Sequence, residues 1–150
     1  MLPKHHMIVG FIVVLILFLS GMSLIPCLII FSSSVLIDID HYFFYVWKRR
    51  DFSLKNAYNY FLRRMKKWFN MHYEERKKYK RMIVIFHGVE FMSLLILLSF
   101  IHQIFLFMLV GFFVHMIADL IEILYKKEAL YSKGSQTYVY VSNKNKKEFR

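Results

Sequence analysis

Histidines and aspartates gather at the ends of long apolar runs, and their types and spacing suit metal binding. Asp38, Asp40 and His41 follow one apolar run, while His115 and Asp119 lie inside another. His115 and Asp119 are four positions apart, so they would share one face of a helix. Ionisable side chains are costly in apolar surroundings and usually mark functional sites there. These two clusters therefore predict chemistry rather than packing.

A third cluster, His87 and Glu90, opens another apolar run, and a pair of histidines lies near the start of the chain. Of that pair we expect His6 rather than His5 to take part, because Gly10 follows His6 on the same helical face. The candidate metal ligands are His6, Asp38, Asp40, His41, His87, His115 and Asp119. They offer nitrogen and oxygen without a thiolate, which favours zinc and also suits manganese, iron or magnesium.

The carboxylates in these clusters have more than one role open to them. Asp38 and Asp40 point in different directions on a regular helix, so one of them can bind the metal while the other orients a histidine. Glu90 and Asp40 are the candidates for a catalytic carboxylate, with Glu90 as general base or extra ligand. Taken singly, each cluster could equally be a hydrogen-bonded pair or a helix cap, so the prediction depends on whether the clusters meet.

The elements that must position these residues are apolar enough for a membrane. The chain has 150 residues, 57% of them hydrophobic, and a mean hydropathy of +0.39. Soluble domains are nearer about 45–50% apolar. Residues 7–37 carry no charge and would form one helix of about 46 Å, against a hydrocarbon core of about 30 Å. Because Gly21 marks a turn and Pro26 suits the first turn of a helix, we expect two helices here.

We therefore predict an all-α integral membrane protein with four transmembrane or intramembrane helices, paired as two hairpins in one domain spanning residues 1–150. The helices are expected at about 5–20, 22–41, 82–99 and 104–125. Of the 21 lysines and arginines, thirteen lie within 48–81, seven lie from Lys126 onward and the last is Lys4. The positive-inside rule then places both termini in the cytoplasm, at a cell or inner membrane. This topology brings the polar clusters to a similar depth, which favours one shared site.

Between the hairpins, residues 48–81 form a basic segment. Apolar residues from Phe52 to Phe69 recur at helical spacing, cations occupy the other surface, and Ser53 is placed to cap the helix. We favour a basic amphipathic helix on anionic lipid headgroups over one that only packs on the bundle. The positive-inside rule explains the net charge of +11, so no nucleic acid is expected as a partner. The polar tail, 126–150, contains a candidate short strand at 137–141.

The order of the motifs resembles that of the YdjM-like inner-membrane metal-dependent hydrolases. That family has an N-terminal His followed by Gly, an Asp-x-Asp-His at the end of a second helix, a third His motif and a late His-x-x-x-Asp. The matching residues are His6 with Gly10, Asp38 to His41, His87, and His115 with Asp119. The chain departs from the pattern at Ile37, where the family has Pro, and at the third motif, which is His-Gly-Val-Glu rather than His-Arg-Gly-x-Thr-His-Ser.

The resemblance implies a membrane-embedded hydrolase that cleaves a phosphoester with metal-activated water, with phospholipids among the candidate substrates. Two other classes of function stay open from the residues. A carrier or channel for metal ions or protons would use the same polar residues as a relay, although the outer half of the bundle offers few polar groups. A non-catalytic membrane adaptor would use the basic amphipathic helix as its active surface.

Overall fold

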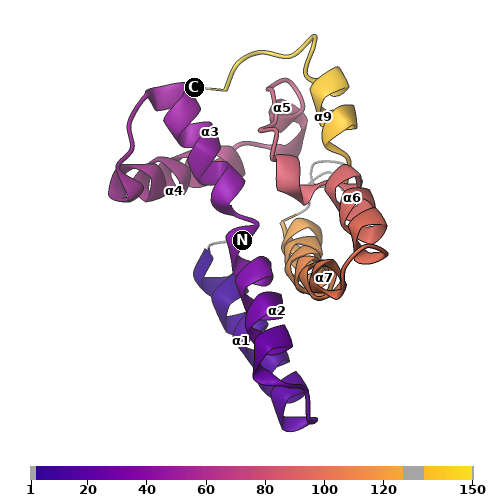
Figure 1. Ribbon diagram of the computed structural model, residues 1–150. Coiled ribbons are helices and arrows are strands. Elements are labelled where there is room, and N and C mark those ends of the chain that lie inside the picture. Colours follow the sequence, from indigo (N-terminus) through magenta and orange to yellow (C-terminus); the bar gives the residue numbers. More distant parts are fainter. Residues whose placement is uncertain (1–2, 127–133, 150) are drawn as a thin grey trace.

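The described part of the chain, residues 3–126 and 134–149 of a computed structural model, is built almost entirely from helices (Figure 1). Within these residues no strand occurs, and the only β-type pairing is an isolated bridge between Tyr79 and Lys147. The expectation of an all-α fold is therefore confirmed.

Two helical hairpins form the apolar part of the molecule. In the first, α1 (Pro3–Leu19) and α2 (Leu24–Leu36) are joined through Gly21, whose φ of 96° is one that glycine adopts without strain. In the second, α6 (Val89–Ser99) and α7 (Gln103–Tyr125) are joined at His102. The imidazole of His102 accepts a hydrogen bond from the N–H of Ile104 and so caps α7. Both turns lie where the sequence predicts them, and α7 packs against α1, α2 and α6.

The helix expected over 22–41 is interrupted at its polar end. After α2 the chain turns at 37–38 and continues as α3 (Ile39–Arg49). The side chains explain the break, because the carboxylates of Asp38 and Asp40 both approach His87. On an uninterrupted helix these two aspartates would diverge by about 200°. The turn brings both of them to the same partner.

The helix expected over 82–99 begins later, at Val89. Residues 82–84 are not helical, and Ile85–His87 form a single 3-10 turn. Side chains from elsewhere hold this backbone, since Val84 N–H donates to Gln136 and Phe86 N–H donates to Asp40. With 11 residues, α6 is only about 16 Å long, which is shorter than a hydrocarbon core of about 30 Å.

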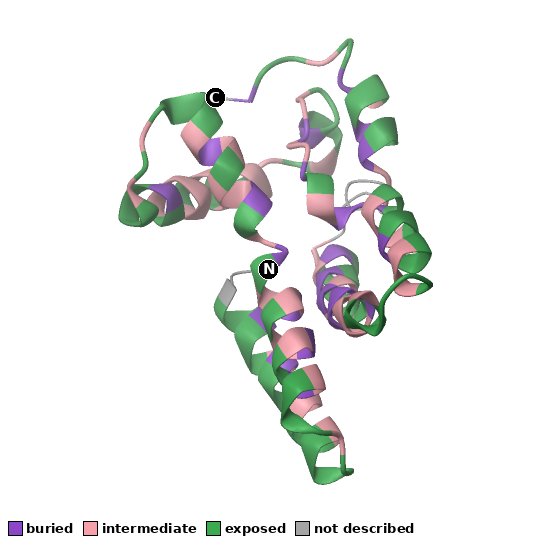
Figure 2. Cartoon of the chain, in the orientation of Figure 1, coloured by how far each residue is buried: buried purple, intermediate pink, exposed green. Residues whose placement is uncertain are grey.

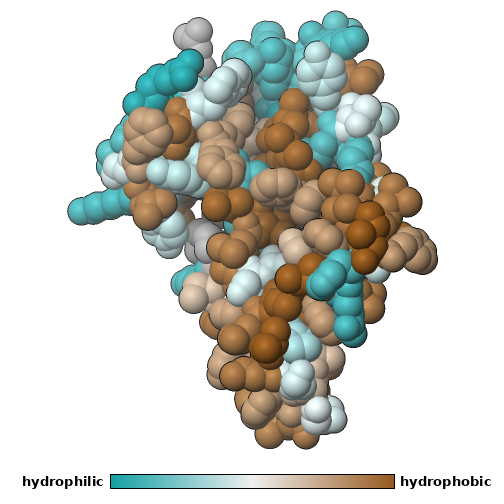
Figure 3. All heavy atoms as spheres, viewed as in Figure 1, coloured by the Kyte–Doolittle hydropathy of each residue, from teal (hydrophilic) through white to brown (hydrophobic). Residues whose placement is uncertain are grey.

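Two helical stretches, Leu24–Arg49 and Gln103–Tyr125, are long and apolar enough to cross a membrane. The helices Lys4–Leu19 and Val89–Ser99 are apolar but shorter, so the structure does not show four full spans. Much of the outer surface of the first hairpin is exposed (Figure 2) and apolar (Figure 3), whereas hydrophilic side chains gather toward the opposite end of the molecule. A large exposed apolar surface of this kind is typical of proteins that contact lipid or a partner.

The basic segment contains α4 (Leu54–Asn70) and the short α5 (Tyr73–Arg76). The hydroxyl of Ser53 accepts a hydrogen bond from Asn56 N–H, which confirms the predicted cap. On the inner side of α4, the ring of Phe61 lies 5.6 Å from that of His41 on α3, so α4 packs beside the polar end of the hairpins.

The prediction of a short strand at 137–141 is wrong, because these residues belong to the helix α9 (Gln136–Ser142). The hydroxyl of Ser135 accepts from Tyr138 N–H, and the carboxylate of Glu90 accepts from the N–H groups of Gln136 and Thr137. These bonds satisfy the first turn of a helix. A five-residue strand without a partner has no such compensation.

Candidate metal centre

The seven expected ligands come together where the two hairpins meet. His6 comes from α1, His87 from the 3-10 turn, and His115 from α7. The aspartates and the remaining histidine are Asp38, Asp40, His41 and Asp119. His6, His87, His115 and Asp119 are each 1% exposed or less. Burying so many polar groups is costly unless they are paired or bind an ion.

The Nδ1 atom of His115 is held by the backbone of α2. It lies 2.8 Å from the carbonyl oxygen of Ser34, and a carbonyl can only accept, so this nitrogen carries the hydrogen. In a neutral imidazole the other nitrogen, Nε2, is then an acceptor with a free lone pair. The sequence offered no signal for this contact, because the acceptor is a backbone group.

Asp40 fixes the orientation of His87 in the same way. Its Oδ2 lies 3.0 Å from His87 Nδ1 and also accepts from Phe86 N–H at 3.1 Å. Its Oδ1 lies 2.7 Å from Nδ1 of His41. Both oxygens of Asp40 are therefore engaged in orienting histidines, and His87 directs Nε2 toward Asp38 Oδ1 and His115 Nε2. Of the two aspartates left open by the sequence, Asp40 is the orienting one.

The Nε2 atoms of His87 and His115 point at each other. His87 Nε2 and His115 Nε2 are 3.1 Å apart, and two carboxylate oxygens flank them. Asp38 Oδ1 lies 3.2 Å from His87 Nε2 and 3.8 Å from His115 Nε2, while Asp119 Oδ2 lies 3.6 and 3.3 Å from the same atoms. If one of the two imidazoles carried an extra proton on Nε2, that N–H could donate to only one of the neighbouring acceptors at a time. A cation at their centre would contact all four.

Most of the spacings among these four atoms are in the range expected for ligands of one ion. Five of their six mutual distances lie between 3.1 and 3.8 Å. Ligands about 2.0–2.1 Å from an ion in tetrahedral geometry are separated by about 3.3–3.4 Å. Three overlapping groups could hold a metal ion, because the ligand atoms in each lie within 4.8 Å of one another: His87 with His115 and Asp119, Asp38 with His41 and His87, and His6 with Asp38 and His115.

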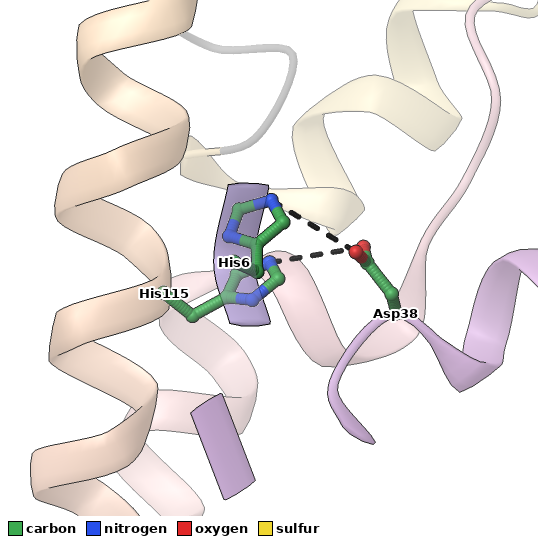
Figure 4. A group of neighbouring side chains, drawn as sticks. All are labelled: His6, Asp38 and His115. Carbon is green, nitrogen blue, oxygen red and sulfur yellow. Dashed lines mark ion pairs between the residues drawn. The ribbon is translucent and has the colours of Figure 1, made fainter. Parts of the chain in front are cut away.

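His6 extends this cluster on the side of α1 (Figure 4). Its ring stacks on that of His115, with centroids 3.9 Å apart and planes 13° from parallel. Its Nε2 lies 3.5 Å from Asp119 Oδ1 and 3.9 Å from Asp38 Oδ2. Within the described residues, neither ring nitrogen of His6 nor Asp38 Oδ2 has a hydrogen-bond partner, although all three atoms are buried. Buried polar atoms without a partner point to a ligand. His5 is exposed, in agreement with the choice of His6 over His5.

Small residues let the helices approach closely enough for these contacts. A Cβ on Gly10 would collide with the hydroxyl of Ser34, and one on Gly111 would collide with the Ile30 carbonyl and the Ser33 hydroxyl. Gly10 lies one turn after His6, and Gly111 lies one turn before His115. The close packing of α1 and α7 on α2 therefore places both histidines, which supports the reason for preferring His6.

The structure does not bring Glu90 into the cluster. Its carboxylate accepts hydrogen bonds from Ser135 and from backbone N–H groups at the start of α9, and it lies against Gly88. The expected role of Glu90 as general base or extra ligand is therefore replaced by a structural one. The i, i+3 spacing from His87 was misleading, because Gly88 separates a 3-10 turn from α6.

An apolar groove of about 470 Å³ lies beside the metal cluster, between α2, α6 and α7. Its lining includes Ile29, Ser33, Ile37, Phe86, Leu95 and Phe112. Ile37 and Phe86 directly precede Asp38 and His87 in the chain, so the groove reaches the edge of the cluster. Its volume lies within the range of about 300–1,000 Å³ typical of small-molecule sites.

Comparisons with known proteins do not place the chain in a family: no protein-family model matches it, and no curated protein or solved structure is significantly similar. What the site can do is therefore argued from its own geometry.

Proposed function

We propose that this protein is a membrane-embedded, metal-dependent hydrolase that cleaves a phosphoester, with zinc as its metal. The observation that carries the proposal is the pair of facing acceptors, His87 Nε2 and His115 Nε2, flanked by two carboxylates. Mixed histidine nitrogen and carboxylate oxygen ligands suit zinc. When bound, such an ion would polarise a phosphoryl oxygen and lower the pKa of water.

The chain's own residues have distinct roles in this proposal. Asp40 positions His87 and His41, and the Ser34 carbonyl positions His115. Asp38 Oδ2, which has no hydrogen-bond partner among the described residues, is placed to accept a proton from an attacking water. His6 Nε2 faces the same space and holds the substrate or the water in place.

For the membrane topology, we propose that both hairpins are embedded with the metal centre on the cytoplasmic side. In the sequence, the lysines and arginines are Lys4, those within 48–81 and those from Lys126 onward, so none lies in the hairpin turns. The two longer helices would cross the bilayer, and α1 and α6 would enter it without matching its full thickness. Exposed Trp47, Phe52 and Leu54 suit contact with the headgroup region.

Phospholipids are the substrate class that best suits the surroundings of the centre. The apolar groove between α2, α6 and α7 ends beside the cluster and could hold an acyl chain while the phosphoester lies at the metal. The order of the polar motifs, from His6 to Asp119, also supports membership of the YdjM-like hydrolases.

The proposal is tested with the full chain purified in neutral detergent without chelator. We expect about one zinc per chain and measurable hydrolysis of a chromogenic phosphodiester or of a phospholipid. Asp119→Ala should lose both the metal and the turnover. His5→Ala should keep both, because His5 is exposed and only neighbours the site residue His6 in the chain. Wild-type protein without bound metal would refute the metal centre. Metal binding without turnover on any phosphoester would refute the reaction but leave the centre in place.

A further inference from the structure

A second site lies away from the metal cluster, in a polar cleft between α3, α4 and the C-terminal segment. The cleft has a volume of about 920 Å³. Its cationic lining residues are Lys48, Arg49, Arg63, Arg64 and Lys67. Among the described residues that line it, the acidic ones are Asp51 and Glu148. Five cations against two carboxylates leave an excess of positive charge in one concave place.

The cleft is built by a repeating pattern on two helices. From α4 it takes Asn56, Asn59, Tyr60, Arg63, Arg64 and Lys67, which follow one another at i, i+3, i+4, i+7, i+8 and i+11. That is one continuous helical face. From α3 it takes Tyr45, Lys48 and Arg49, with the same i, i+3, i+4 spacing. The polar face of α4 is therefore turned toward α3, while Phe61 on another face of α4 contacts His41.

The C-terminal segment closes the third side and is firmly attached. Lys80 N–H donates to the Lys147 carbonyl at 2.8 Å, and Lys147 N–H donates to the Lys78 carbonyl at 2.9 Å. Phe149 is buried against Trp68 and Tyr79, and its ring lies 4.8 Å from the Arg64 guanidinium. The cleft is thus a formed feature of the fold rather than a loose collection of surface charges.

The acids of the cleft are already engaged, whereas among its arginines Arg64 alone donates hydrogen bonds within the described part of the chain, to the Phe149 carbonyl at 3.1 Å and the Tyr60 hydroxyl at 3.4 Å. Asp51 accepts hydrogen bonds from Tyr45, Ser53 and Asn56, and Glu148 accepts from Lys80 at 2.8 Å. The arginines that line the cleft are Arg49, Arg63 and Arg64. Within the described residues, none of them makes an ion pair with a carboxylate. Arg49 rests on the Tyr60 ring at 5.1 Å, which leaves its N–H donors for another partner.

We propose that this cleft binds a phosphate-bearing anion, either the headgroup of an anionic lipid or a soluble phosphoester. Guanidinium groups match phosphate oxygens with paired donors, and converging cations in a concave site concentrate the attraction. The cleft shares α3 with the metal centre, since Asp40 and His41 begin that helix and Lys48 and Arg49 end it. The binding does not depend on hydrolysis, so it can be tested separately.

The test uses two double variants with the same loss of charge. Arg49→Gln with Arg63→Gln removes two cleft arginines, whereas Lys55→Gln with Lys66→Gln removes two exposed cations of α4 that do not line the cleft. Full-length protein in neutral detergent is titrated calorimetrically with inorganic phosphate, glycerol phosphate and short-chain phosphatidylglycerol, with phosphatidylcholine for comparison. Circular dichroism checks that each variant keeps its helices.

We expect the arginine pair to weaken binding about tenfold or more and the lysine pair to weaken it less than about twofold. Asp119→Ala should bind like the wild type, which excludes the metal centre as the place of binding. Binding of the soluble phosphates identifies a free phosphoester, and binding of phosphatidylglycerol alone identifies a lipid headgroup. Equal weakening by both pairs, loss in Asp119→Ala, no binding of any probe, or tighter binding of a single-stranded oligonucleotide would each overturn the proposal.

Discussion

His87 and His115 face each other through Nε2 atoms 3.1 Å apart, while the opposite nitrogen of each ring is bound to an acceptor. The acceptors are Asp40 for His87 and the Ser34 carbonyl for His115. Two lone pairs would repel at this distance, so either a proton or a metal ion lies between the two nitrogens. The pair is thus the strongest single indication of a cation site, and it links residues 28 positions apart in the sequence.

His6 is predicted to contribute to metal affinity and His5 is not. His6 stacks on His115 and directs Nε2 toward Asp119 and Asp38, whereas His5 is exposed. We expect His6→Ala to weaken zinc binding about tenfold or more, measured by competition with a chromogenic chelator. His5→Ala is the matched control and should change nothing. Equal affinities in the two variants would remove His6 from the site.

Asp40 is predicted to act through the histidines that it orients. Asp40→Asn keeps the shape of the side chain but loses the carboxylate that holds Nδ1 of His87 and of His41. We expect about 10–100-fold weaker metal binding with the helices intact. Glu74→Gln, which removes the same charge from an exposed surface position, should leave the affinity unchanged. Complete loss of the metal in Asp40→Asn would instead make Asp40 a direct ligand.

Glu90 is predicted to stabilise α9 rather than to catalyse. Its carboxylate accepts from Ser135 and from the N–H groups of Gln136 and Thr137. We therefore expect Glu90→Gln to keep its metal and to change kcat by less than about threefold, at a cost of about 1 kcal/mol in stability. Hydrogen exchange should show faster opening of α9. A fall in kcat of more than about 100-fold with α9 intact would restore the general-base role.

Gly111 is predicted to set the distance between α7 and α2. In Gly111→Ala the new Cβ would meet the Ile30 carbonyl and the Ser33 hydroxyl, so the helices must separate. We expect a loss of about 1–3 kcal/mol in thermal or chemical unfolding, together with weaker metal binding. Gly134→Ala is the control, because nothing lies within 4 Å of a Cβ added there. Unchanged stability and metal content in Gly111→Ala would show that the helices can adjust.

Asp51 is predicted to make the corner between α3 and α4 sensitive to acid. Hydrogen bonds from the Tyr45 hydroxyl, the Ser53 N–H and the Asn56 amide lower the pKa of Asp51. A pKa that is lower in the folded state than in the unfolded state stabilises the fold above the unfolded value of about 3.9, and this stabilisation is lost as pH falls below it. Asp51→Asn should therefore lower Tm at neutral pH and converge with the wild type as pH falls through the lowered pKa of the folded state. A constant difference across that range would contradict the assignment.

The sequence by itself determined the helical class, the two hairpin turns and the membership of the polar cluster. These depend on local signals: an uncharged run of given length, glycine at the first turn, and the i, i+4 spacing of His115 and Asp119. His6 could be separated from His5 because Gly10 marks the helix face that packs closely.

The tertiary structure decided which aspartate orients and which faces the acceptors, where the helices break, and what Glu90 does. Each of these depends on a partner distant in the chain: Asp40 meets residues 86–87, Gln136 holds Val84, and Glu90 meets the start of α9. Periodicity reports the face of a helix but not the backbone groups that lie opposite it. Buried polar groups take whichever partner satisfies them, and that choice is made only when the elements pack.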